Sequence, residues 1–259
     1  MTALAQYLAL SRRAVLGTVR QPTSVVPSMM FPLLFLALSS AAFDRATQLP
    51  GFPRVDSFLQ FVVSTTVVQG CLFGSIAAGG DMATDIEGGF FDRLVASPVA
   101  RTSILMGRVM GAVAFGFVQA WVFFGITTIF GLQVEAGVTG MLMVSVVGAT
   151  LAGGFGAIWV AFALRTGSAE AVRGSFPLLF SLLFLSSAFF PRDLMQGWFQ
   201  SVADLNPLSH MIEGLRAQVI DGLALGDFAV AWGIALAIFA VGTIAASLAL
   251  RSRLAAYET

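Results

Sequence analysis

The sequence predicts an all-α membrane protein with six transmembrane helices. Of its 259 residues, 57% are hydrophobic and only 11% are charged, and the mean hydropathy is +0.87. A soluble domain is about 45–50% apolar, so this composition indicates a chain that crosses a bilayer repeatedly. The second observation is a series of long apolar runs, most of them near the ~20 residues that a helix needs to cross the hydrocarbon.

The six predicted spans are separated by short polar segments. The fifth run has roughly 16 residues, which is short for a complete crossing. Gly79 and Gly80 are predicted to end the second span. Glycines in the fourth span, among them Gly154, should let helices approach closely. The spans cover residues 24–43, 58–80, 104–130, 140–164, 175–190 and 228–250.

Residues 1–21 are not apolar enough to span a bilayer. Leu4, Leu8 and Leu16 can share one helical face, with Arg12 and Arg13 beside it. This pattern is typical of an amphipathic helix that lies in the membrane interface.

A charged stretch separates the second span from the third and predicts a short helix over residues 84–98. Each charge would cost about 2.5–3.5 kcal/mol at a bilayer centre, so the stretch must lie in water or against protein. Thr84 or Asp85 can cap the helix start, and Pro98 ends it. One face is apolar and consists of Phe90, Phe91, Leu94 and Val95. A helix of this kind needs a partner surface.

Residues 191–227 are too polar to span and too apolar for a free loop. Their pattern predicts two short re-entrant helices with a break at Asn206-Pro207. Glu213 and Arg216 lie three residues apart on one turn, where they can form a pair that stabilises these helices.

Arginine counting predicts the orientation of the chain. With six spans both termini lie on one side, and that side receives ten of the 14 basic residues, all of which are arginine. The positive-inside rule therefore places both termini and the 84–98 helix in the cytoplasm, in a multi-pass protein of the cell membrane. The opposite side carries Arg45, Arg54, Arg192 and Arg216.

The residue inventory excludes several function classes. The formal net charge is zero, which gives no electrostatic basis for binding nucleic acid. His210 is the only histidine, Cys71 is the only cysteine, and neither a serine elbow nor a zinc-protease motif occurs. We therefore expect no catalytic residue, metal or cofactor in this chain. A P-loop needs a lysine, and the chain has none, so any ATPase must be another polypeptide.

Two motifs resemble the membrane subunit of type-2 ABC transporters, in its drug- and lipid-exporter branch. Residues 85–101 (DIEGGFFDRLVASPVAR) resemble the family signature between spans two and three, although Ile86 and Gly89 replace its usual arginine and threonine. Residues 206–216 (NPLSHMIEGLR) resemble the stretch before span six.

The resemblance implies a division of labour between subunits. Two copies of a separate ATPase subunit would bind ATP and Mg²⁺, and a second permease copy or a paralogue would complete the pore in the lipid bilayer. Helix 84–98 would be the coupling helix, with Phe90, Phe91 and Leu94 as its docking face. Asp85, Glu87, Asp92 and Arg93 would make the surrounding contacts.

The resemblance also implies a central cavity lined by spans one, two and five. An apolar cavity rich in phenylalanine suits a hydrophobic or amphipathic cargo, such as a drug, a lipid or a glycolipid. Two other readings stay open at this point: a six-span secondary transporter or channel, and a membrane scaffold that transports nothing. The cavity residues would be Phe31, Phe35, Phe58, Phe61, Gln69, Phe176, Phe180 and Phe184.

Overall fold

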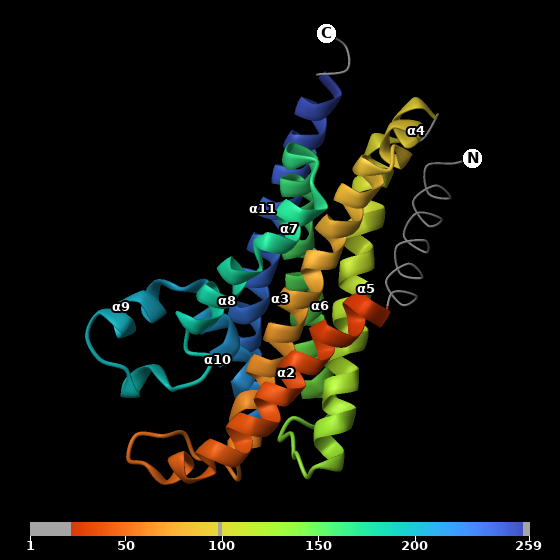
Figure 1. Ribbon diagram of the computed structural model, residues 1–259. Coiled ribbons are helices and arrows are strands. Elements are labelled where there is room, and N and C mark those ends of the chain that lie inside the picture. Colours follow the sequence, from red (N-terminus) through yellow and green to blue (C-terminus); the bar gives the residue numbers. More distant parts are fainter. Residues whose placement is uncertain (1–21, 98–99, 256–259) are drawn as a thin grey trace.

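The computed structural model describes residues 22–97 and 100–255, and every regular element within these ranges is helical (Figure 1). The interfacial helix expected over residues 1–21 lies outside the described residues. Five helices are long and apolar enough to cross a membrane. They are α2 (Pro22–Phe43), α3 (Phe58–Glu87), α5 (Arg101–Ile129), α6 (Gly137–Thr166) and α11 (Leu225–Ala255).

These five helices correspond to the first, second, third, fourth and sixth predicted spans. The second is longer than expected, because α3 continues through Gly79 and Gly80 to Glu87. Gly79 permits close packing instead of ending the helix, since a Cβ there would lie 2.6 Å from the Cβ of Trp159 in α6. Helix α3 consequently sits at the centre of the bundle, in contact with α2, α5 and α6.

Helices α6 and α11 approach each other closely along their backbones. A Cβ at Gly154 would lie 2.8 Å from the backbone nitrogen of Phe239, and one at Gly242 would fall on the carbonyl oxygen of Gly154. The close packing predicted for Gly154 is therefore confirmed.

The fifth predicted span, 175–190, is not a single crossing helix. Only α8 (Phe176–Phe184) of that run is an α-helix. A separate short helix, α7 (Ala169–Gly174), precedes it, with Ser175 between the two. Helix α8 has nine residues and is about 14 Å long, well short of the ~30 Å hydrocarbon. The described residues thus contain five candidate spans, not six. The apolar run is present as predicted, but the helix within it ends early. Side chains from other segments donate hydrogen bonds to the backbone carbonyls at the end of α8.

Two short helices follow, as the sequence predicts for residues 191–227. They are α9 (Trp198–Leu205) and α10 (Pro207–Ile220), and Asn206 separates them at the predicted break. Single turns of 3₁₀-helix, η1 (Asp44–Gln48) and η2 (Arg192–Leu194), occur in the connecting segments. In Figure 1, α9 stands out from the bundle and α10 returns along it toward the start of α11.

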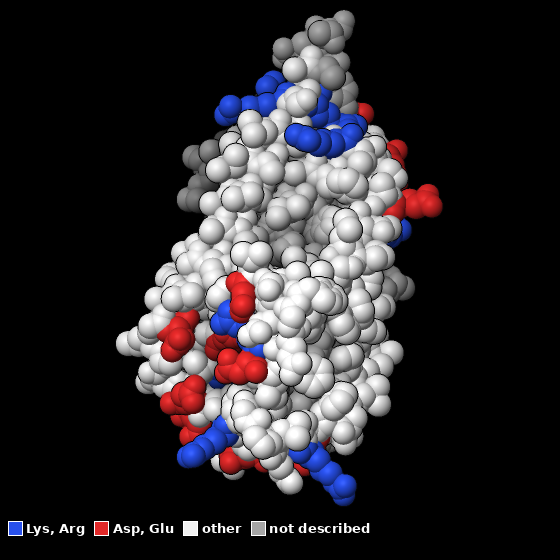
Figure 2. Space-filling model, turned by 90° about the vertical axis from the view of Figure 1, so that its left-hand side faces the viewer, with Lys and Arg blue, Asp and Glu red and all other residues white. Residues whose placement is uncertain are grey.

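The bundle has two distinct ends. The α4 end holds the end of α3, helices α4 (Phe90–Ala96) and α7, and the end of α11; the opposite end holds the starts of α3, α6 and α11 (Figure 1). On the face shown in Figure 2, a band without charged side chains separates the arginines near the α4 end from mixed charges lower down. This distribution is that of a protein with an apolar belt between two polar ends.

Candidate functional site

The charged stretch after α3 folds as a helix extension, a glycine break and a new short helix. Thr84 and Asp85 belong to α3 and do not cap a helix, contrary to the prediction. The chain reverses at Gly88-Gly89, where Gly89 has a φ of 67°, a left-handed conformation that favours glycine. Helix α4 then covers Phe90–Ala96, so the predicted 84–98 helix is shorter and starts later.

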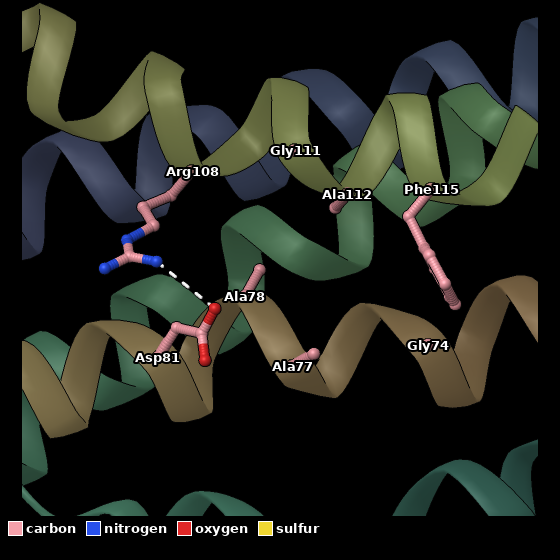
Figure 3. Close-up of a pocket in the computed structure, with 8 residues that line it drawn as sticks. All are labelled: Gly74, Ala77, Ala78, Asp81, Arg108, Gly111, Ala112 and Phe115. Atoms are coloured by element: carbon pink, nitrogen blue, oxygen red, sulfur yellow. Dashed lines mark hydrogen bonds and ion pairs between the residues drawn. The ribbon is translucent and has the colours of Figure 1, made fainter. Parts of the chain in front are cut away.

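Arg108 of α5 lets α3 carry acidic residues beyond its apolar part. Its guanidinium donates to the carboxylates of Asp81 (3.2 Å) and Asp85 on α3. Figure 3 shows Arg108 reaching toward Asp81 at one end of a small cavity between the two helices. The rest of that cavity is lined by Gly74, Ala77, Ala78, Gly111, Ala112 and Phe115. Charge pairing at this position explains why the helix does not end at Gly80.

Phe91 lies inside the chain and not on the surface of α4. Its side chain is fully buried, and the guanidinium carbon of Arg253 on α11 lies 5.7 Å from its ring centroid. The same arginine donates from Nη1 to the carbonyl oxygen of Leu164, near the end of α6 (2.9 Å). Phe91 therefore joins α4 to α6 and α11, and this placement does not support it as part of a docking face for another protein.

Glu87 connects the end of α3 to α7. The backbone N–H of Ala169 donates to Oε1 of Glu87 (2.8 Å), and the N–H of Ala171 donates to the hydroxyl of Ser168. A carboxylate at a helix N-terminus satisfies an orphan donor and interacts favourably with the helix dipole. Glu87 thus acts within the chain, although its side chain is also exposed.

The other residues of α4 that were predicted to contact an ATPase subunit lie at its surface. Asp92 and Arg93 are exposed, and Phe90 and Leu94 are half-buried. The guanidinium of Arg93 lies 5.9 Å from the ring centroid of Phe90. This part of α4 therefore presents charges beside partly covered apolar side chains.

Five of the predicted cavity residues gather on one face made by α2 and α8. Phe31 lies 6.0 Å from Phe180 and Phe35 lies 6.4 Å from Phe184, between ring centroids. Phe31, Phe176 and Phe184 are 41%, 37% and 38% exposed, so the cluster is open on one side. We call this cluster the aromatic face. Its members are Phe31, Phe35, Phe176, Phe180 and Phe184, together with Phe73 and Phe189, which the sequence analysis missed.

Phe58, Phe61 and Gln69 do not belong to the aromatic face. All three are buried, and Phe58 and Phe61 pack in a second aromatic cluster with Phe52 at the opposite end of the bundle. Phe73 was missed because α3 is buried on nearly all sides. The spacing of its apolar residues therefore does not show which side contacts the aromatic residues of a neighbouring helix.

Glu213 and Arg216 do not form the predicted pair. Glu213 binds the guanidinium of Arg192 in η2, with 2.7 Å between Nε and Oε1. Arg216 is buried and donates to backbone carbonyls instead. Both residues therefore bind segments other than the turn that they share: Glu213 binds η2, and Arg216 binds α3 and the turn after α8.

Within the described residues no group of histidine, cysteine, aspartate and glutamate side chains is arranged to hold a metal ion. The described residues instead offer two surfaces: the aromatic face near the middle of the bundle, and a polar surface on α4 at one end.

Comparison with known proteins identifies the family of this chain. Residues 5–220 match the family described as ABC-2 type transporter. The chain is 30% identical over 220 residues to the daunorubicin resistance ABC transporter permease protein DrrB1 of Streptomyces coeruleorubidus, covering 83% of this chain and 75% of that protein. It is 31% identical to the putative transport permease ycf38 of Pyropia yezoensis, covering 80% and 72%.

A probable doxorubicin resistance ABC transporter permease protein, DrrC of Mycobacterium tuberculosis, is 23% identical over 86% of this chain and 79% of its own length. The chain therefore belongs to the ABC-2 type transporter family, as a multi-pass membrane permease without an ATPase site of its own.

Proposed function

We propose that this permease exports a hydrophobic or amphipathic molecule, such as a drug, a lipid or a glycolipid, with energy from ATP hydrolysed by a separate subunit. The observation that carries the proposal is the aromatic face, which offers half-exposed phenylalanine rings near the middle of an otherwise closely packed bundle. Aromatic rings bind apolar molecules through large contact areas without requiring a fixed polar geometry. The names of two relatives, which refer to resistance to daunorubicin and doxorubicin, support this cargo class.

The power would come from an ATPase subunit that docks on α4. Asp92 and Arg93 are exposed there and Phe90 and Leu94 are half-buried, which is the mixture of charged rim and apolar contact found in protein interfaces. Two ATPase copies would bind ATP and Mg²⁺, and a second permease copy or a paralogue would face this one. Movement of α4 would reach α11 and α6 through Phe91 and Arg253. Movement of the adjoining end of α3 would reach α7 through Glu87.

The proposal is tested with the permease purified together with its ATPase subunit and reconstituted in liposomes. We expect a fluorescent anthracycline to be transported in an ATP-dependent manner. Phe31→Ala removes a half-exposed ring of the aromatic face, and loss of one aromatic contact of about 1 kcal/mol should raise the KM for this cargo about fivefold.

The matched control is Phe130→Ala at the end of α5, where the ring is 76% exposed and lies outside the aromatic face. This variant should keep the parental KM. Equal KM values for Phe31→Ala and the parent, across several apolar cargoes, would remove the aromatic face from the transport path.

A further inference from the structure

Helix α8 ends inside the bundle and leaves backbone carbonyls that need hydrogen-bond donors. The helix stops at Phe184, and the chain turns at residues 185–190. Ala188 lies beside Thr65, whose hydroxyl donates to the Ala188 carbonyl (2.7 Å). Thr65 is only seven residues, or about 10 Å, from the start of α3. In an apolar environment each unsatisfied carbonyl would be costly, so the end of α8 depends on donors from elsewhere in the chain.

Asn206 supplies donors to two of these carbonyls. Its Nδ2 donates to the carbonyl oxygens of Leu182 (2.8 Å) and Leu185 (2.9 Å), while its Oδ1 accepts from the N–H of Leu208 (2.9 Å). One amide group therefore caps the end of α8 and the start of α10 together. Only an amide fits both tasks, because a carboxylate cannot donate and a hydroxyl has a single proton.

Arg216 supplies donors to the next two carbonyls. Its Nη2 donates to Ser187 and Ala188 (3.2 Å each), and its Nε donates to the Phe61 carbonyl on α3 (3.0 Å). The guanidinium carbon lies 3.6 Å from the Phe61 ring centroid, and the residue is only 5% exposed. A buried arginine in a membrane bundle is a candidate functional group, and here its planar fork joins α3, α10 and the turn after α8.

We propose that Asn206 and Arg216 are positioning residues for transport, because they fix the end of α8, the helix that carries Phe176, Phe180 and Phe184 of the aromatic face. Phe176, at the start of α8, is held by Phe73 of α3, with 4.7 Å between ring centroids. Phe184, at the other end, stands on the capped turn and contacts Phe189 within it (4.7 Å). Loss of either cap should therefore displace the Phe184 end of the face more than the Phe176 end. This inference rests on the proposed role of the aromatic face in binding cargo.

The variants Asn206→Asp and Arg216→Lys test the proposal in the reconstituted complex with its ATPase. Asn206→Asp keeps the acceptor for α10 and removes the donors for α8. Arg216→Lys keeps the charge and removes the planar fork. We expect the KM for an apolar cargo to rise roughly tenfold, the factor that corresponds to losing one or two hydrogen bonds, with cargo-free ATP hydrolysis unchanged. The control is His210→Gln on α10, since His210 contacts Arg192 and Asp204 and none of the α8 carbonyls.

Hydrogen–deuterium exchange provides a second readout that does not depend on transport. Exchange at residues 182–190 should accelerate in both variants relative to the parent and to His210→Gln. If the assembled variants keep the parental KM and the parental exchange, the proposal is wrong. Faster exchange with an unchanged KM would leave the residues as caps and overturn their positioning role.

The milder variant Ser209→Ala decides the matter if the first two fail to assemble. The hydroxyl of Ser209 accepts a hydrogen bond from the N–H of Ser187 (3.0 Å). Its removal should raise both the KM and the exchange rate, by smaller factors than the first two variants. A parental KM together with a parental exchange rate in Ser209→Ala would overturn the inference. A parent complex that transports no apolar cargo would instead contradict the proposed function, while exchange would still test the caps.

Discussion

Gly242 is the residue at which α11 touches the backbone of α6. A Cβ at position 242 would clash with the carbonyl oxygen of Gly154. In a membrane, where the hydrophobic effect does not drive helices together, such close backbone contact contributes packing energy that larger residues would prevent.

We therefore predict that Gly242→Val destabilises the folded protein by about 1–3 kcal/mol, because the two helices must separate. The melting temperature of the detergent-purified protein measures this effect. Gly233→Ala on the same helix is the control, because nothing lies within 4 Å of a Cβ at that position. It should melt at or slightly above the parental temperature, since alanine favours a helix over glycine. A parental melting temperature for Gly242→Val would contradict the close packing.

Sequence reasoning at the residue scale identified the aromatic residues of α4 but misplaced Phe91. An apolar helical face shows that a partner surface exists, yet it does not say whether that surface belongs to the same chain. Phe91 meets Arg253, which is 162 positions further along the sequence, and no local pattern contains that information. The same reason explains why the Glu213–Arg216 pair failed: Arg192, from another segment, is a closer partner for Glu213.

At the scale of elements, α4 is joined to the bundle through α3 and α11. Helix α4 packs on the end of α3. Its Phe91 is buried beside Arg253 of α11, which in turn donates to a carbonyl at the end of α6. An element held in this way transmits a displacement to its neighbours instead of moving alone, because packed interfaces resist continuous deformation.

We predict that Arg253→Gln lowers the number of cargo molecules exported per ATP by about fivefold, because the contact between α11 and α4 loses roughly 1 kcal/mol. ATP hydrolysis by the complex should continue. Parallel assays of transport and phosphate release measure the ratio. Arg251→Gln is the control, since Arg251 is exposed on the same last turns of α11. A parental ratio for Arg253→Gln would show that α11 does not take part in coupling.

Hydropathy predicted the five long helices but not the early end of α8 within the fifth run. Apolar content fixes whether a segment can enter a bilayer, whereas the end of α8 depends on donors from Asn206 and Arg216. The extension of α3 was missed for a related reason, because Arg108 on another helix forms ion pairs with both Asp81 and Asp85.

At the scale of the whole molecule, Figure 2 shows an uncharged band between the arginines near the α4 end and the mixed charges lower down. By their places in the helices, the residues at the α4 end include Arg93 of α4, Arg101 at the start of α5, Arg173 of α7 and Arg251 near the end of α11. The positive-inside rule predicts that this end faces the cytoplasm, where the proposed ATPase subunit would have access to α4.

Site-directed labelling checks this orientation. Cys71 is buried, so the natural chain provides a silent background, and Asp92→Cys introduces a thiol on the exposed side of α4. A membrane-impermeant maleimide should label this variant in inside-out vesicles and not in intact cells. Gln48→Cys at the opposite end should show the reverse pattern. Labelling of Asp92→Cys in intact cells would contradict both the orientation and the docking proposal.

Helix α3 is enclosed far more completely than its neighbours: 89% of its most apolar stretch is buried, against 28% for α11. An apolar residue on the outer side of α11 can therefore be exchanged for another during evolution with little need for a compensating change. On α3, a change of even one methylene alters the fit with a neighbouring helix. Correlated substitutions between homologues should accordingly be concentrated in pairs that include a residue of α3, while α11 should vary independently along its outer side.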